Sequence, residues 1–282
     1  MPKLRINFLK PLIWALLFAV IVAVAMLVWL YTGSLSTAKV KIFQKVPLPM
    51  ALVNGQPLLM SAFLTRYNVA QLSSNGSVNP QLKISIYNQL IKEAVVAQTA
   101  SQKDISVNRA QIDFEYSALQ SQSNFQPSLQ NFGFDPNSFK NDVIKPNLLL
   151  QHLQIWFNSQ PNLNPNAYAL ANDLITQING GQDMAVLAGK YAQNLTDKGS
   201  EGDMGFVQIT DISPELRESV SELKPGETKI IPGLKGLYLI ILEEQTGNSL
   251  HLREIFLPTA NFNDWLESQI KNFNIINFLK FN

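Results

Sequence analysis

The stretch ANDLITQINGGQDMAVLAGKYAQNLTDKGSEGDMGF, residues 171–206, decides the fold of the second half of the chain. Apolar residues recur at helical spacing on both sides of Gly180-Gly181, a pair that ends one helix, and Asp183 caps the next. A glycine-bearing loop then leads to Gly202-Asp203-Met204-Gly205-Phe206. The stretch therefore predicts two consecutive helices and a glycine-bearing turn within an α/β domain.

The flanking sequence extends this domain in both directions. Asn164-Pro165 is a cap and first-turn signal for the first of these helices, and Ser213-Pro214 opens a third one. Strands are expected near 228–232 and 237–243, and His152–Ser159 is expected to form a strand ahead of the helices. The predicted order β-α-α-α-β-β indicates a compact α/β domain over residues 151–247.

The preceding part, residues 46–150, is expected to be mainly helical. Leu82, Ile86, Leu90 and Ala94 follow one another at i+4, which is typical of an amphipathic helix. The predicted features are, in chain order, a Val53-Asn54-Gly55 strand and turn, helices at Ser61–Gln71 and Gln81–Gln102, an Asn108/Gln111 capping box that opens a further helix, a loop over 120–138 and a helix at about 139–151.

The tail, residues 248–282, is expected to form strand, helix and strand. The strand covers Leu250–Leu257, the helix Asn263–Asn272, and the last strand Phe273–Phe281. Two placements are open: the tail packs on the α/β domain, or it completes the helical domain.

The charge of the chain is unevenly distributed. The 282 residues carry 22 basic and 21 acidic side chains, a net charge of +1. The first 45 residues contain six of the basic side chains and no acidic one, so residues 46–282 carry a net charge of −5. Charged residues make up 15 % of the chain, against about 25 % in ordinary soluble domains. No basic surface suited to nucleic acid is indicated.

The basic N-terminal part holds an apolar segment, Leu12–Tyr31, without one polar or charged interruption. A helix of this length spans about 30 Å, the thickness of a bilayer core. Trp14 lies near one end and Trp29 near the other, where such rings favour the interface. The segment predicts a single transmembrane helix, within residues 1–45 that also form a cytoplasmic stub and a linker.

Two other interpretations of the apolar segment are a buried core helix and a cleaved signal peptide. A core helix would show a polar face, and a signal peptide has a shorter apolar region of about 7–15 residues. Lys3, Arg5 and Lys10 favour a cytoplasmic N-terminus, although the lysines at 39–45 oppose it. The expected location is the cell membrane, with the body of the protein extracytoplasmic.

The residue types exclude several chemistries. Without cysteine, no thiolate nucleophile, disulfide or sulfur-based metal site exists, and His152 and His251 are too few for a histidine-rich metal site. His251 and Glu254 lie three apart in a predicted strand and would face opposite sides. We expect no metal and no cofactor.

Two groups of segments resemble known families. VNGQP (53–57), YNQLIKEAVVAQTA (87–100) and ISVNRAQID (105–113) resemble the N-terminal helical chaperone domain of SurA/PrsA-type foldases. The tract that begins at residue 171 resembles a parvulin-type (PpiC-type) peptidyl-prolyl isomerase domain. Its most specific segments are GDMGF (202–206), LKPGE (223–227) and GLYLIIL (236–242). The resemblance covers about residues 50–245 and implies an α+β chain with a single N-terminal transmembrane helix, a mainly α-helical chaperone domain and a parvulin-like α/β domain.

The resemblance also assigns site positions. Parvulins line the proline site with a first-strand histidine, a cysteine or aspartate, a methionine or leucine, a phenylalanine and a last-strand histidine. Placed on this pattern, the positions fall at Gln154 (or His152), Leu195 (or Asn194), Ile212, Leu216 and Tyr238. Met204 and Phe206, in the GDMGF segment, are the implied substrate-binding residues.

Most of these positions are substituted, and this shapes the expected function. Isomerases of this type lower a rotation barrier of about 18–20 kcal/mol by holding the prolyl ring and favouring the twisted amide. Loss of both histidines and of the phenylalanine predicts weak or absent isomerase activity. The resemblance implies an extracytoplasmic foldase that binds unfolded or translocated polypeptides. An active isomerase with a remodelled pocket and an assembly scaffold with one fixed partner are the alternatives.

Overall fold

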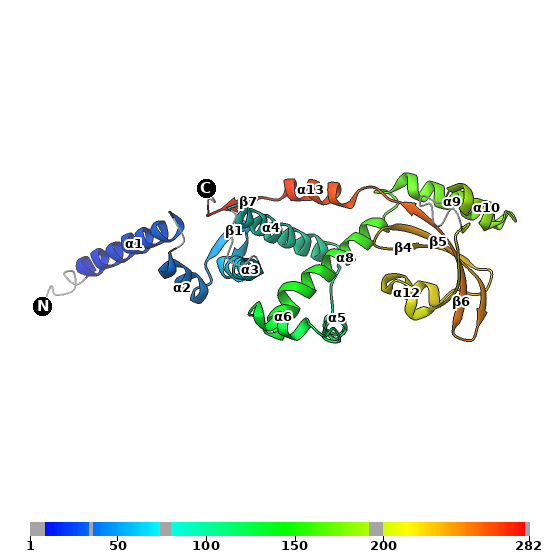
Figure 1. Ribbon diagram of the computed structural model, residues 1–282. Helices are drawn as coiled ribbons and strands as arrows, with labels where there is room; N and C mark the ends of the chain where they lie inside the picture. The colour runs from blue at the N-terminus through cyan, green and yellow to red at the C-terminus, as the bar shows by residue number, and fades with distance from the viewer. Residues whose placement is uncertain (1–8, 34–35, 74–79, 192–199, 280–282) are drawn as a thin grey trace, which may run out of the picture. The chain divides into compact units, whose positions relative to one another are not determined.

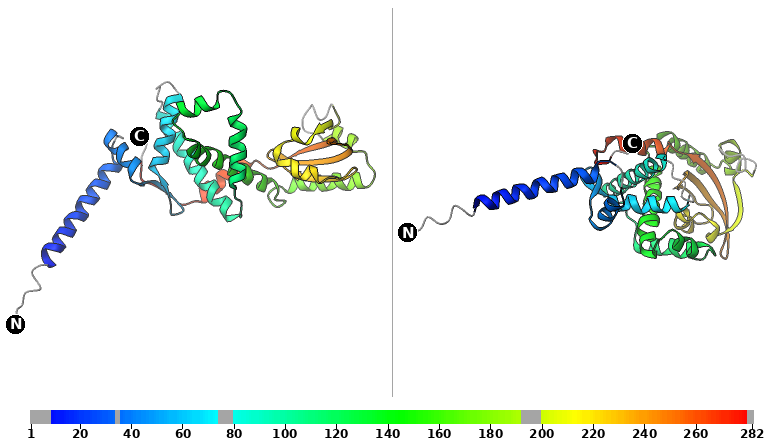
Figure 2. Two further views of the ribbon diagram at one scale, coloured as in Figure 1. Left: turned by 90° about the horizontal axis from the view of Figure 1, so that it is seen from below. Right: turned by 60° about the vertical axis from the view of Figure 1, so that its left-hand side comes forward.

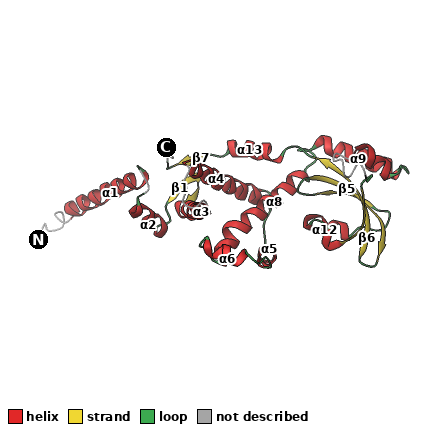
Figure 3. Cartoon of the chain, in the orientation of Figure 1, coloured by secondary structure: helices red, strands yellow, loops and turns green. Residues whose placement is uncertain are grey.

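The chain folds into two compact units, each assembled from separate stretches of sequence. The computed structural model describes residues 9–33, 36–73, 80–191 and 200–279 (Figure 1). The first unit comprises Met1–Val95, Ser123–Pro136 and Lys271–Asn282, and the second unit comprises Val96–Gln122 and Asn137–Ile270. Both units combine helices with antiparallel strands (Figure 3), so the chain has the expected mixed α+β character.

Helices dominate the first unit. They are α1 (Leu9–Tyr31), α2 (Thr37–Lys45), α3 (Met60–Ser73), the first part of α4 (Pro80–Gln102) and α6 (Phe125–Asn131). α3 and α4 confirm the predicted helices, and α4 buries Ile86 and Leu90 on its apolar stripe as the i+4 spacing predicts. The prediction of a loop over 120–138 is wrong for Phe125–Asn131, which form α6. There, burial of Leu129 stabilises a helix against the polar composition of the segment.

α1 covers the apolar segment near the N-terminus. Its side chains are described from Leu16 onward, and the large apolar ones as far as Trp29 are exposed. Among the helices whose residues are described, none is long and apolar enough to cross a membrane. At the end of α1, Tyr31 packs against Phe43 of α2, with 5.7 Å between ring centroids.

A three-stranded sheet, in the order β2-β1-β7, completes the first unit. β1 (Pro49–Val53) and β2 (Gln56–Leu59) form a hairpin, because Asn54 and Gly55 both adopt the positive φ of a tight two-residue turn. β7 (Ile275–Asn277) pairs antiparallel with β1. β7 is shorter than the predicted strand, whose end at 280–281 lies outside the described residues. One end of the tail thus completes the first unit.

Helices α5 (Arg109–Gln120), α7 (Pro136–Phe139) and α8 (Lys145–Asn158), with a π-helical turn η1 (Lys140–Ile144), belong to the second unit. The predicted capping box is confirmed. The backbone N–H of Gln111 donates to Asn108 Oδ1 at 2.9 Å, and the N–H of Asn108 donates to Gln111 Oε1 at 3.0 Å. This reciprocal pair satisfies two backbone donors at the start of α5.

The strand predicted at His152–Ser159 is wrong, because these residues continue α8. Leu148, Leu153 and Phe157 are buried at spacings of about one helical turn. The apolar run Ile155–Phe157 is too short for its composition alone to distinguish strand from helix. The α/β domain therefore lacks a strand before its helices.

A four-stranded antiparallel sheet forms the centre of the second unit, in the order β3-β6-β5-β4 (Figure 2). The strands are β3 (Asp203–Gln208), β4 (Thr228–Pro232), β5 (Gly236–Thr246) and β6 (Ser249–Pro258). β4, β5 and β6 confirm predicted strands. β6 pairs with both β3 and β5, so the sheet continues past residue 247, the expected end of the parvulin-like domain.

Helices cover both faces of this sheet (Figure 1). α9 (Pro165–Asn179) and α10 (Met184–Tyr191) pack on the face that carries Leu237, Leu239, Ile255 and Leu257. α12 (Pro214–Ser221) packs on the face that carries Ile240, Leu242, Leu250 and Leu252. This division follows the alternation of side chains along β5 and β6. α13 (Phe262–Asn272) leads back towards β7 along the chain.

Candidate functional site

Three of the five pocket positions come together between α12 and β5. Ile212 precedes α12, Leu216 lies in its first turn, and both are about 95 % buried in a core cluster against which Tyr238 packs. Gly233 lies at the same place: a Cβ there would approach Tyr238 Cε2 to 2.7 Å and Leu216 Cδ2 to 3.0 Å. The side chains at these positions thus belong to one packed cluster, with Tyr238 partly buried against it.

The residue opposite Tyr238 is Phe256 of β6. The two residues are register partners, and their rings lie 5.3 Å apart between centroids. Sequence reasoning missed Phe256, because the strand that contains it was predicted as part of the tail, whose placement stayed open. The alternating segment Leu250–Leu257 predicted a strand, but nothing in it indicates its place in the sheet.

Gln154 does not lie on a strand. It belongs to α8, and its Nε2 donates to the carbonyl of Leu234 at 2.7 Å. The buried Asn158, one turn further, donates to the carbonyl of Gly233 at 2.7 Å and accepts from Thr259 Oγ1 at 2.7 Å. Gln154 therefore helps to hold the β4–β5 turn whose Gly233 faces Tyr238, instead of presenting a group to the pocket.

The remaining assigned positions do not lie in this cluster. Leu195 and its alternative Asn194 lie outside the described residues. His152, the register alternative for Gln154, is on α8 with Nδ1 at 3.2 Å from the carbonyl oxygen of Ser106. The five positions of the expected pocket are thus divided between α8, the α12–β5 cluster and a segment outside the described chain.

Met204 and Phe206 are on β3, at the edge of the sheet. Met204 is 39 % exposed and Phe206 is 53 % exposed. Phe206 is the register partner of His251 and stacks on its ring, with 4.9 Å between centroids. His251 alternates with Leu250 and Leu252, which face α12, so Phe206 lies on the opposite face of the sheet from Tyr238. The two groups of expected site residues do not form one pocket.

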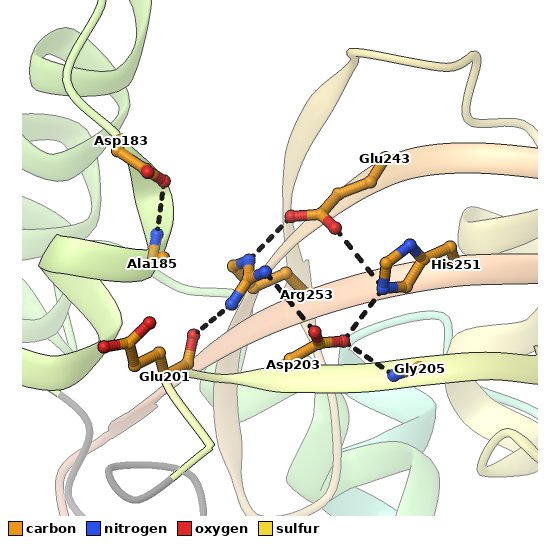
Figure 4. Close-up of polar contacts among 8 residues, drawn as sticks. All are labelled: Asp183, Ala185, Glu201, Asp203, Gly205, Glu243, His251 and Arg253. Atoms are coloured by element: carbon orange, nitrogen blue, oxygen red, sulfur yellow. Dashed lines mark hydrogen bonds and ion pairs between the residues drawn. The ribbon is translucent and has the colours of Figure 1, made fainter.

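A polar network that sequence reasoning missed surrounds this edge (Figure 4). His251 Nε2 lies 2.9 Å from Asp203 Oδ1 and 3.4 Å from Glu243 Oε2. Arg253 Nε donates to Glu243 Oε1 at 2.6 Å, and Arg253 Nη1 donates to the carbonyl of Glu201 at 2.7 Å. The network ties β3, β6 and β5 together, and its members are too far apart in sequence for a local motif to reveal them.

The electrostatics of the network follow from these contacts. The backbone N–H of Gly205, then His251 and Arg253, hold the pKa of Asp203 below its ordinary value of 3.8. Burial acts to lower the pKa of Arg253, but the hydrogen bond to Glu243 and the charges of Glu243, Asp203 and Asp183 together outweigh burial, and the pKa rises. In the described part of the chain, no group of His, Asp and Glu residues is arranged to hold a metal ion.

Comparison with known proteins agrees with the two resemblances. A family model for the SurA-like N-terminal domain matches residues 1–154, and one for the PPIC-type PPIase domain matches residues 140–246. Foldase protein PrsA 1 of Lactobacillus johnsonii is 29 % identical over 154 residues, which cover 47 % of this chain and 51 % of the relative. The match thus spans about half the length of that relative.

A solved structure is also similar. The crystal structure of the peptidylprolyl isomerase PrsA from Bacillus anthracis has 18 % identity and a TM-score of 0.23, and it covers 66 % of this chain and 86 % of that one. The first family model covers more than half of the chain, and the second ends before β6 begins. The chain therefore belongs to the family with a SurA-like N-terminal domain, and its second part matches the PPIC-type PPIase domain.

Proposed function

We propose that the chain is a membrane-anchored extracytoplasmic foldase that binds unfolded or translocated polypeptides, and that the isomerase activity of its PPIC-type domain is weak or lost. Family membership supports the foldase role. The part of the proposal that concerns activity depends on one observation: Ile212, Leu216 and Tyr238 pack together where the resemblance places the proline site.

Close packing of these side chains would oppose isomerisation. An isomerase must hold a prolyl ring against apolar side chains while its amide twists through a barrier of about 18–20 kcal/mol. Gly233 illustrates how little room remains, since one added carbon would lie 2.7 Å from the Tyr238 ring. Opening a site for a proline ring would require Leu216 and Tyr238 to leave their packed positions, at the cost of buried apolar contact.

Membrane anchoring is the second part of the proposal, and the sequence of the apolar segment supports it. Leu12–Leu30 has no polar or charged side chain apart from the indole N–H of Trp14 and Trp29, and from Leu16 to Trp29 the large apolar side chains of α1 are exposed. Exposed apolar side chains of this number are stable in lipid and unfavourable in water. The three basic residues Lys3, Arg5 and Lys10 support a cytoplasmic N-terminus.

Two assays on the full chain in detergent or nanodiscs test the proposal. Aggregation of several unrelated unfolded proteins should be suppressed, while the rate of prolyl isomerisation in a model peptide should stay at the uncatalysed value. Acceleration that Tyr238→Ala abolishes, and that the control Phe114→Ala on α5 leaves intact, would establish an active isomerase instead. Protection of a single protein among many would favour the fixed-partner scaffold.

A further inference from the structure

The charges of the chain separate by folded unit. Of its 22 basic and 21 acidic side chains, 11 basic and 2 acidic ones belong to the first unit, a net charge of +9; the remaining 11 basic and 19 acidic ones give the second unit −8. The first acidic residue in the sequence is Glu93, and both of its carboxylate oxygens accept from Arg66 at 2.7 Å. The unit that contains the apolar helix α1 is therefore also the basic one, and it attracts anions.

Packed contacts join the end of α1 to the rest of the first unit. The ring of Tyr31 lies 5.7 Å from that of Phe43 in α2, and its hydroxyl donates to the carbonyl of Pro49 at 2.6 Å. Lys39 of α2 is only 5 % exposed, and its ammonium group donates to the carbonyl of Thr32, directly after α1. α2 is therefore held at the end of α1, at the level where a spanning helix meets the lipid headgroups.

The lysines of α2 lie on two opposite sides of the helix. Lys39 and Phe43 are buried, whereas Lys41 and Lys45, each two residues further along, are exposed. α2 packs on α3, and neither helix contains an acidic residue. In the described part of the chain, neither Lys41 nor Lys45 forms an ion pair. Like charges four residues apart destabilise a helix, and an anionic surface would offset this repulsion.

We propose that the exposed side of α2, with Lys41 and Lys45, binds the anionic phospholipid headgroups of the membrane that α1 enters. This inference rests on the membrane anchoring proposed above and adds that the first unit responds to the charge of the lipid. Phosphate oxygens of the headgroups would accept hydrogen bonds from the two ammonium groups. The attraction increases with the content of anionic lipid and decreases with salt.

Lysine acetylation of the full chain in nanodiscs tests this inference. One set of discs contains phosphatidylcholine alone, and the other an equal mixture with phosphatidylglycerol. An N-hydroxysuccinimide ester should acetylate Lys41 and Lys45 about fivefold more slowly in the anionic discs, the factor for attraction of one lysine to an anionic surface. Salt at about 1 M should remove this difference, because it shortens the Debye length to about 3 Å. Lys145 and Lys224, exposed in the second unit, should differ by less than about twofold between the discs.

Paired variants separate the effect of charge from that of structure. Amide exchange within α2 of the wild-type chain should be about tenfold slower in the anionic discs. Lys41→Gln/Lys45→Gln should abolish this dependence on lipid, whereas Lys41→Arg/Lys45→Arg, which keeps both charges, should retain it. Lys145→Gln/Lys224→Gln is the matched control, because it removes the same charge from exposed positions of the second unit, and it should also retain the dependence.

Three outcomes would overturn the inference. They are equal acetylation of Lys41 and Lys45 in the two kinds of disc, a difference that persists in high salt, and equal effects of the two glutamine double variants. Protection by soluble polyphosphate in neutral discs, with none from phosphatidylglycerol, would assign the surface to a soluble polyanion instead. In these cases a chain that stays with the discs retains the proposed anchoring. A chain that separates from both kinds of disc contradicts the anchoring itself.

Discussion

At position 233, the absence of a side chain allows the ring of Tyr238 to meet Leu216. Tyr238 also packs against Phe256, and Leu216 is buried in the first turn of α12, so the lack of a side chain at position 233 allows this close packing. On the opposite face of the sheet, hydrogen bonds and ion pairs connect the residues. Asp203 is the point where the Gly205 N–H, His251 and Arg253 converge. Gly233 and Asp203 each lead to a separate testable prediction.

Gly233→Ala should destabilise the second unit by about 1–3 kcal/mol, because the new methyl group must displace the Tyr238 ring or Leu216. Denaturant unfolding followed by the fluorescence of the second unit measures this. Gly189→Ala is the matched control, since it adds the same carbon within helix α10 where no atom lies within 4 Å. The control should be neutral or more stable by up to about 1 kcal/mol. Equal effects would show that position 233 is not crowded.

Asp203→Asn should make the second unit less sensitive to acid. The pKa of Asp203 is lowered in the folded state, so its carboxylate stabilises the fold above its unfolded value of 3.8 and loses this effect as pH falls through the lower folded pKa. The variant should therefore be less stable than wild type at neutral pH, and the difference should shrink below pH 3.8. Unfolding free energies measured across this range test it, with exposed Asp211→Asn as control. A constant difference at all pH values would contradict the pairing.

At the scale of single elements, local sequence patterns predicted the helices and caps that interactions between neighbouring residues stabilise. The Asn108/Gln111 box and the apolar stripe of α4 are complete within a few turns of chain, and both were predictable. Part of α8 was predicted as a strand, because the contacts that stabilise this helix are made with residues distant in the sequence. Leu153 and Phe157 are buried against other elements, and Asn158 binds the β4–β5 turn. An apolar run alone contains no information on such partners.

Asn158→Ala should destabilise the second unit by about 2–4 kcal/mol. The side chain is 1 % exposed, and its loss leaves the carbonyl of Gly233 and the hydroxyl of Thr259 without their buried partner. Asn172→Ala on the exposed side of α9 is the matched control and should change stability by less than about 0.5 kcal/mol. A loss below that limit for Asn158→Ala would mean that water replaces the amide at this junction.

At the scale of the whole molecule, each sheet is completed by a strand from late in the chain. β6 fills the position between β3 and β5, and β7 joins the β1–β2 hairpin across more than two hundred residues. The pairing of β6 with β3 across about forty residues is why the order of the sheet and the Asp203–His251 network were not predictable. The family and the mixed α+β class were predictable, since short motifs such as GDMGF and LKPGE depend on local turns.

Deletion of residues 273–282 should loosen the first unit and leave the second unit intact. The deletion removes β7, together with the bonds from Asn54 N to Asn274 O at 2.8 Å and from Phe278 N to Met50 O at 3.0 Å. Amide exchange in β1 should accelerate by at least about tenfold, the equivalent of one or two lost hydrogen bonds, while exchange in β5 and β6 should be unchanged. Deletion of 280–282 alone is the control. Unchanged exchange in β1 would mean that the β1–β2 hairpin is stable without β7.

The position of β6 and β7 in the chain has a consequence for the order in which the protein is made. A ribosome or a translocation channel releases the N-terminal residues first, so the β1–β2 hairpin emerges before β7, and β3, β4 and β5 emerge before β6. Until residue 258 has emerged, β3 and β5 have no strand between them, and until residue 277 has emerged, β1 keeps an open edge. Each sheet therefore keeps an uncovered strand edge until the late part of the chain has emerged.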